Sequence, residues 1–120
     1  MSSISDVLFT IIKDRFPREY VPEAYEFIIE ALEYSVKRLP EKRHISGKEL
    51  SEGIRDYAKE SFGPMTLTVL EQWGLSTTGD YGKIVYRLID LGLMAKSDTD
   101  NISDFDDIYK FDEVFSNAYL

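Results

Sequence analysis

The sequence predicts a mainly α-helical fold, a helical bundle that contains a winged-helix-like helix-turn-helix and a small β-hairpin. Apolar residues recur at helical spacing up to Gly92, and proline and glycine divide that region into five segments of helical length. After Gly92 the helical period stops, and two short apolar runs remain that could pair as strands. We therefore expect one domain over residues 1–120, with a helical pair in 1–40 and the winged-helix-like part in 45–115.

The first two helices are predicted from Ser5 to Phe16 and from Pro22 onward. Pro17 ends the first, because the residue before a proline avoids the helical region, and Pro22 suits the first turn of the second. The apolar arc of the second helix is too wide for a single buried face, so we expect a central helix or one helix of a dimer interface. One of its stripes comprises Tyr25, Ile28, Ile29, Leu32, Val36 and Leu39, and the second comprises Ala24, Phe27, Ala31 and Tyr34.

The third helix has the clearest start signal in the chain. Ser46 and Glu49 are spaced as a capping box, in which each side chain accepts a hydrogen bond from the backbone amide of the other residue. Gly63 is placed to end this helix with a positive φ. A short fourth helix is then expected over 64–73.

A fifth helix should begin at a cap on Thr77 or Thr78 and close at Gly92. Beyond it we expect strands at 93–97 and 107–111, an intervening loop, and a short terminal helix capped by Asp112. Helices followed by a hairpin are the order of a winged helix, an analogy that concerns the fold alone.

The net charge of −8 is concentrated near the C-terminus, where seven acidic residues follow Ser97 and Lys110 is the one base. Such a surface repels phosphate backbones and anionic membranes. The predicted fifth helix balances Lys83 and Arg87 against Asp80 and Asp90. We therefore expect no nucleic-acid and no membrane partner, and the charge disfavours a DNA-binding winged helix.

The chain contains no cysteine, which excludes disulfides, zinc–thiolate sites, iron–sulfur clusters and cysteine nucleophiles. The segment that follows Met1 lacks the basic and apolar regions of a signal peptide. No apolar run approaches the roughly 20 residues that span a bilayer. These features predict a cytoplasmic protein.

Two features of the sequence are candidates for a catalytic or metal-binding site. His44 is the only histidine, and a lone imidazole can act as a general base. The acidic loop Asp98–Asp107 could supply oxygen ligands to calcium, although an EF-hand count from Asp98 places Tyr109 where the bidentate glutamate belongs. No nucleophile motif or phosphate-binding glycine loop accompanies either feature. We therefore assign no catalytic, cofactor-binding or metal residues and no cofactor.

Five segments of the chain form a distinctive set: Tyr25-Glu26-Phe27, Arg43-His44-Ile45-Ser46-Gly47, Phe62-Gly63-Pro64-Met65, Val69-Leu70-Glu71-Gln72-Trp73-Gly74 and Asp104-Phe105-Asp106-Asp107-Ile108-Tyr109. Together they resemble a family of small bacterial proteins best represented in the planctomycete and verrucomicrobial group. The resemblance covers about residues 22–115. It implies a bacterial cytoplasmic protein and no site residues.

The preferred functional hypothesis is a non-catalytic protein-interaction or regulatory module. Its expected partner is a second copy of the chain, as a homodimer, or a basic protein surface. The expected contact surface is the second stripe of the second helix together with the acidic wing, which is the Asp98–Asp107 loop of the predicted hairpin. The alternative is an enzyme or a metal-binding protein that uses His44 or the Asp98–Asp107 loop.

Overall fold

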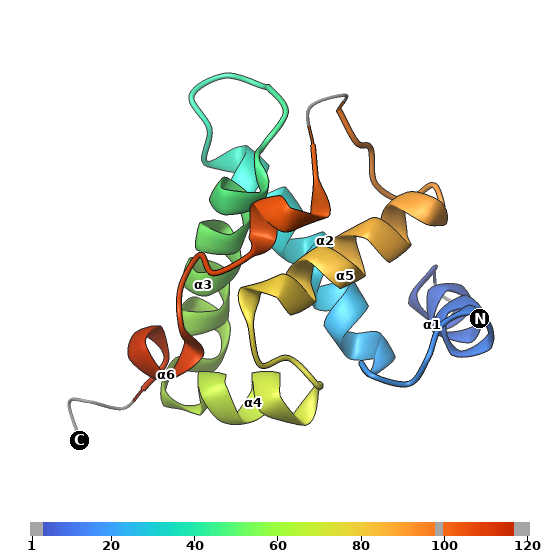
Figure 1. Cartoon of the computed structure of the whole chain (residues 1–120), viewed down its shortest axis with the longest axis horizontal. Coiled ribbons are helices and arrows are strands. Elements are labelled where there is room, and N and C mark those ends of the chain that lie inside the picture. The colour runs from blue at the N-terminus through green and yellow to red at the C-terminus, as the bar shows by residue number, and fades with distance from the viewer. Residues whose placement is uncertain (1–3, 98–99, 117–120) are drawn as a thin grey trace.

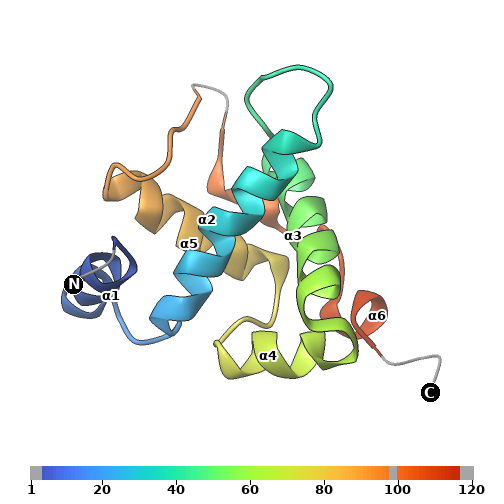
Figure 2. The same ribbon diagram turned by 180° about the vertical axis from the view of Figure 1, so that it is seen from behind.

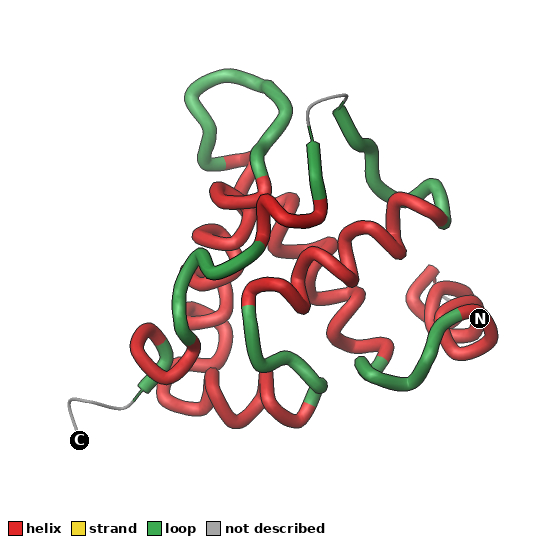
Figure 3. Tube along the Cα trace, viewed as in Figure 1, coloured by secondary structure: helices red, strands yellow, loops and turns green. Residues whose placement is uncertain are grey.

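The computed structural model describes residues 4–97 and 100–116, and all regular structure within them is helical (Figure 3). This agrees with the predicted α class. The elements are α1 (Ile4–Arg15), α2 (Pro22–Lys37), α3 (Gly47–Phe62), the 3-10 turn η1 (Gly63–Met65), α4 (Thr66–Gln72), α5 (Thr78–Asp90), the 3-10 turn η2 (Ile102–Phe105) and α6 (Phe111–Val114).

Helix α2 lies at the centre of the molecule and packs against α1, α3 and α5 (Figure 2). Both of its apolar stripes are used: Tyr25 and Ile28 of the first and Ala24, Phe27 and Ala31 of the second are buried. The prediction of a central helix is therefore confirmed. Three of the four residues of the second stripe thus pack inside the chain, and Tyr34 alone stays partly exposed.

The crossing of α2 and α3 depends on a glycine. A Cβ atom at Gly53 would lie 1.8 Å from the Oγ atom of Ser35. Ser35 is itself buried, and its hydroxyl donates a hydrogen bond of 2.7 Å to the carbonyl oxygen of Ala31. The absence of a side chain at Gly53 thus sets how closely the two helices approach.

The predicted N-terminal caps of the third and fifth helices are confirmed. Ser46 and Glu49 form the expected capping box at the start of α3, and Thr77 forms one with Asp80 at the start of α5. Gly92 follows α5 with a φ of 78°, which is where the helical period of the sequence stops.

The predicted β-hairpin is wrong, because no strand forms in the part of residues 93–111 that the structure describes. Residues of this segment pack against helices instead of pairing with one another as strands. Phe105 of η2 occupies a slot between two glycines: a Cβ atom would approach its ring to 3.1 Å at either Gly47 or Gly82. Further along, the Ile108 amide donates to the Thr78 Oγ atom at 3.2 Å, so this backbone donor is used on α5.

The C-terminal segment is held by aromatic residues. Rings of Tyr81, Tyr109, Phe111 and Phe115 form a chain of contacts with centroids 5.2–6.3 Å apart. The terminal helix begins at Phe111 after Lys110, so the predicted cap at Asp112 is wrong. Burial of the Phe111 ring against α5 outweighs the preference of aspartate for a cap.

A second aromatic cluster joins α2, α3 and the end of α4. Phe27 lies 5.2 Å from the ring of Trp73 and 5.4 Å from that of Phe62. This cluster lies at the α4 end of the molecule, opposite the loops that precede α3 and follow α5 (Figure 1).

Candidate functional site

A pocket with a volume of about 200 Å³ opens at the end of the molecule where two loops meet. One loop joins α2 to α3 and the other joins α5 to η2, and both stand at the same end of the bundle (Figures 1 and 2). The pocket has an apolar floor and a polar rim. The floor includes Leu32, Val36, Leu50, Val85, Ile89, Met94 and Phe105, and the rim includes Arg43, His44, Ser46, Tyr86, Asp100, Asn101 and Asp104.

The capping box of α3 positions the first loop. Glu49 accepts the Ser46 amide at 3.1 Å, and its carboxylate also receives two hydrogen bonds from the Arg43 guanidinium, at 2.7 and 2.9 Å. Arg43 donates further to the carbonyl oxygen of His44 at 3.1 Å. The backbone of His44 is therefore tied through Arg43 to Glu49 in the first turn of α3.

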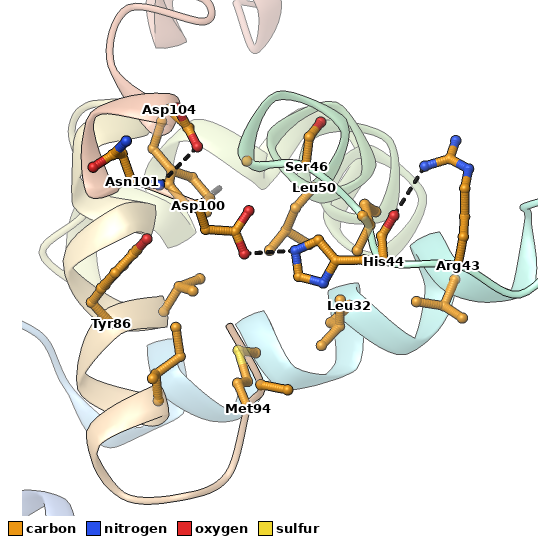
Figure 4. A pocket seen from close by; sticks show the side chains of 17 residues that line it. Leu32, Arg43, His44, Ser46, Leu50, Tyr86, Met94, Asp100, Asn101 and Asp104 are labelled. Carbon is orange, nitrogen blue, oxygen red and sulfur yellow. Dashed lines mark hydrogen bonds and ion pairs between the residues drawn. The ribbon is translucent and has the colours of Figure 1, made fainter. Parts of the chain in front are cut away.

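His44 meets the second loop at Asp100. Its Nε2 atom lies 2.6 Å from Asp100 Oδ2, which also accepts the Ser97 amide at 2.9 Å (Figure 4). Partial burial raises the pKa of Asp100, but the Ser97 amide and His44 together outweigh it and hold that pKa below its usual value. Asp100 is therefore a carboxylate at neutral pH, and its pair with His44 ties the two loops together.

Tyr86 supplies a hydroxyl group that no part of the described chain engages. The side chain is half-buried, but its Oη atom is buried and has no hydrogen-bond partner among residues 4–97 and 100–116. Burial first, and then the charges of Asp100 and Asp104, raise the pKa of Tyr86. The phenol stays neutral, and the potential around it is negative.

The charges on the rim do not cancel. The Arg43 guanidinium is already used by Glu49, at a closest distance of 2.7 Å. Asp104 accepts the Asn101 amide at 3.0 Å, and no ion pair engages its carboxylate within the described residues. Together with Asp100 this leaves two carboxylates at the pocket, faced by one imidazole.

The structure thus joins the two chemical candidates of the sequence. His44 and the acidic loop meet at Asp100, whereas Asp106 and Asp107 do not line the pocket, and Asp98 lies outside the described residues. Sequence reasoning missed Tyr86. Tyr86 follows the buried Val85 on α5, where the sequence pattern predicts an ordinary residue at the edge of the apolar helix face. No sequence motif distinguishes its hydroxyl group.

The surroundings of His44 bear on whether it is a catalytic or metal-binding histidine. The Ser46 hydroxyl, the one nearest His44 in the sequence, accepts the Glu49 amide at 3.1 Å and serves as a helix cap. The His44 side chain is 43% exposed, so it is not shielded from water. No three His, Asp or Glu side chains converge as metal ligands within residues 4–97 and 100–116.

The cationic residues of α5 are also engaged. Arg87 donates to Glu19 and, at 2.9 Å, to the hydroxyl of Tyr25, and its guanidinium lies 5.3 Å from the ring centroid of Tyr20. Lys83 lies 3.6 Å from the same Glu19 carboxylate. These side chains hold the 16–21 segment against α5.

Each helix that the structure describes is too short or too polar to cross a bilayer. No protein-family model, no curated protein and no solved structure matches this chain, and the resemblance to small bacterial proteins stays a prediction.

Proposed function

We propose that this protein is a non-catalytic interaction or regulatory module that binds its ligand in the pocket between α2, α3, α5 and η2. One observation carries the proposal: the buried hydroxyl of Tyr86 has no partner within the described chain. A buried polar group without a hydrogen bond costs about 1–3 kcal/mol, and native proteins leave few such groups. A ligand that bonds to this oxygen removes the cost.

The shape of the pocket supports binding. Apolar side chains form its floor, and a few polar groups converge on its rim, which is the usual composition of a ligand site. We prefer this pocket to the second α2 stripe as the interaction surface, because Ala24, Phe27 and Ala31 of that stripe are buried within the chain. The acidic segment that follows Ser97 contributes Asp100 and Asp104 to the rim.

The contacts of α5 argue against DNA binding. The order α3, α4, α5 is that of a helix-turn-helix, in which α5 would enter the major groove. Duplex binding depends on free Lys and Arg that neutralise phosphates. Arg87 and Lys83 instead pair with Glu19.

A second candidate function is acid–base catalysis, which the 2.6 Å contact between His44 and Asp100 favours. A carboxylate that orients an imidazole is a familiar part of hydrolytic sites. A nucleophile would also be needed, and the Ser46 hydroxyl, the one nearest His44 in the sequence, is already bonded to the Glu49 amide. The interaction module therefore accounts for more of the geometry.

The proposal is tested by fragment screening of the full chain with 15N NMR, using cationic, anionic and neutral fragments. We expect some fragments to shift the amide signals of Leu50, Val85 and Tyr86. Val36→Phe, which fills the floor, should abolish those shifts, while Tyr34→Phe on the other side of α2 should not. If no fragment of any charge moves these signals, or if Val36→Phe binds as well as wild type, the pocket is not a binding site.

A further inference from the structure

We propose that the pocket takes an unbranched alkyl chain that ends in a cationic nitrogen group, an ammonium or a guanidinium. This is the chemistry of a lysine or arginine side chain and of a small alkylamine. The inference rests on the proposed function and names the ligand class of the same site.

The charges of the rim select the sign of the ligand. Among the charged groups that line the pocket, the one guanidinium, that of Arg43, is bound by both carboxylate oxygens of Glu49. Two carboxylates remain, that of Asp100, which is paired with the single imidazole of His44, and that of Asp104, which no ion pair engages within the described residues. Each of them adds negative potential at the Tyr86 hydroxyl. A carboxylate or phosphate on a ligand would meet repulsion there, whereas a cation would be attracted.

The acceptors of the rim match the donors of such a cation. The Tyr86 hydroxyl lies on the same side of the pocket as the carboxylates of Asp100 and Asp104 (Figure 4). An ammonium group has three N–H donors and no acceptor. The phenol oxygen can accept one of these hydrogen bonds, and each carboxylate can accept another with the added strength of opposite charge.

The size and floor of the pocket indicate the rest of the ligand. A volume of about 200 Å³ is below the roughly 300–1,000 Å³ of sites for drug-sized molecules, so it suits one side chain. Leu32, Val36 and Met94 offer hydrocarbon surface to a methylene stem. Lysine and arginine side chains lay their methylene stems along apolar surface in the same way, with the charged end at the polar edge.

Two sources can supply this chemistry, a free alkylamine or a basic side chain on a partner protein. The net charge of −8 favours approach of either one. The experiment is designed to distinguish them.

The test is an NMR titration of the 15N-labelled full chain at neutral pH. The probes are n-pentylamine and the capped peptide acetyl-Gly-Lys-Gly-amide, and the matched controls are pentanoate, n-pentanol and the same peptide with an acetylated lysine. We expect the two cationic probes to shift the Leu50 and Tyr86 amides with millimolar affinity. The controls should bind at least about tenfold more weakly, since each lost charged hydrogen bond costs about that factor.

Three variants localise the effect. Asp104→Asn and Tyr86→Phe should each weaken binding of n-pentylamine about tenfold, while Asp106→Asn removes the same charge outside the pocket and should leave affinity within twofold. In Asp104→Asn the new carboxamide oxygen can still accept the Asn101 amide, so the fold of η2 is kept, and a melting curve checks this. Tighter binding of the lysine peptide than of the amine identifies a protein partner as the source. The reverse order identifies a small amine, and either order supports the cation class.

The inference is overturned if pentanoate or n-pentanol binds in the pocket as tightly as n-pentylamine, a result that leaves the proposed function standing. It is also overturned if Asp106→Asn weakens binding as much as Asp104→Asn, because the attraction would then be a diffuse surface effect. Absence of binding by both cationic probes overturns it too, and the fragment screen then decides the proposed function separately.

Discussion

The hydroxyl oxygens of Tyr81 and Tyr109 lie 2.9 Å apart, and Tyr109 also donates to the carbonyl oxygen of Ser51 at 2.9 Å. A phenol has one proton to donate. Since Tyr109 gives its proton to Ser51, Tyr81 must donate to Tyr109. This relay connects α5, the C-terminal segment and α3 through two side chains.

Tyr109→Phe should therefore destabilise the protein by about 1–3 kcal/mol. The change removes both hydrogen bonds and leaves the buried Tyr81 hydroxyl without a partner, while the ring packing is kept. Urea denaturation monitored by circular dichroism measures the free energy of unfolding. Tyr34→Phe is the control, because its hydroxyl bonds to Glu60 at the surface. Equal stability of the two variants would show that the relay contributes nothing.

Gly53→Ala should destabilise by about 2–3 kcal/mol, because the new methyl group collides with the hydroxyl of Ser35. Ser35→Ala alone should cost less than about 1 kcal/mol. In the double variant the colliding oxygen is gone, so part of the loss at Gly53 should be recovered. A double-mutant cycle measures this coupling. Strict additivity would mean that another neighbour, and not Ser35, sets the helix spacing.

Tyr86→Phe should stabilise the ligand-free protein by about 1 kcal/mol, since it removes the buried hydroxyl that lacks a partner within the described residues. The same variant is expected to bind cationic probes more weakly, so stability and binding should move in opposite directions. Thermal denaturation with and without n-pentylamine records both quantities. Destabilisation of the ligand-free variant would mean that the hydroxyl already has a bonding partner.

The Arg43–Glu49 pair should produce acid sensitivity. Hydrogen bonds from Arg43 and from the Ser46 amide lower the pKa of Glu49 from 4.5 to about 2. The folded state binds the Glu49 proton more weakly than the unfolded state, so the stabilisation is complete above about pH 5 and is lost as the pH falls towards 2. Both side chains are partly exposed, so we expect a contribution below about 1 kcal/mol.

The measurement is the difference in unfolding free energy between wild type and Glu49→Gln across that pH range. It should be constant above about pH 5 and shrink towards pH 2. Glu52→Gln, one turn further along α3, controls for the loss of a surface carboxylate. A difference that does not change with pH would contradict the assigned role of Glu49.

Local sequence rules predicted most of the helical architecture. The caps at Ser46 and Thr77 and the stop at Gly92 depend on neighbours within a few residues, so they can be read from the sequence. The wide apolar arc of α2 predicted either a central helix or one helix of a dimer interface, and the central position is the one observed. The hairpin prediction was wrong because a short apolar run does not show whether it pairs with another strand or packs against a helix. The slot between Gly47 and Gly82 that receives Phe105 joins three distant segments, and no local pattern encodes it.

The candidate site could be predicted only in part. His44 and the acidic loop stood out because a lone histidine and a cluster of aspartates are unusual. Their contact through Asp100 spans more than fifty residues of chain and depends on how two loops lie on the folded bundle. The burial of a tyrosine hydroxyl depends on every side chain around it, which is why Tyr86 gave no signal.

The aromatic corner at Trp73 has a practical consequence for spectroscopy. Trp73 is the only indole in the chain, and it packs against Phe27 and Phe62 at the end of the bundle away from the two loops. Its fluorescence emission should shift to longer wavelength when α2, α3 and α4 separate. Occupancy of the pocket should leave that emission unchanged, so a single optical probe reports global unfolding without interference from the ligand.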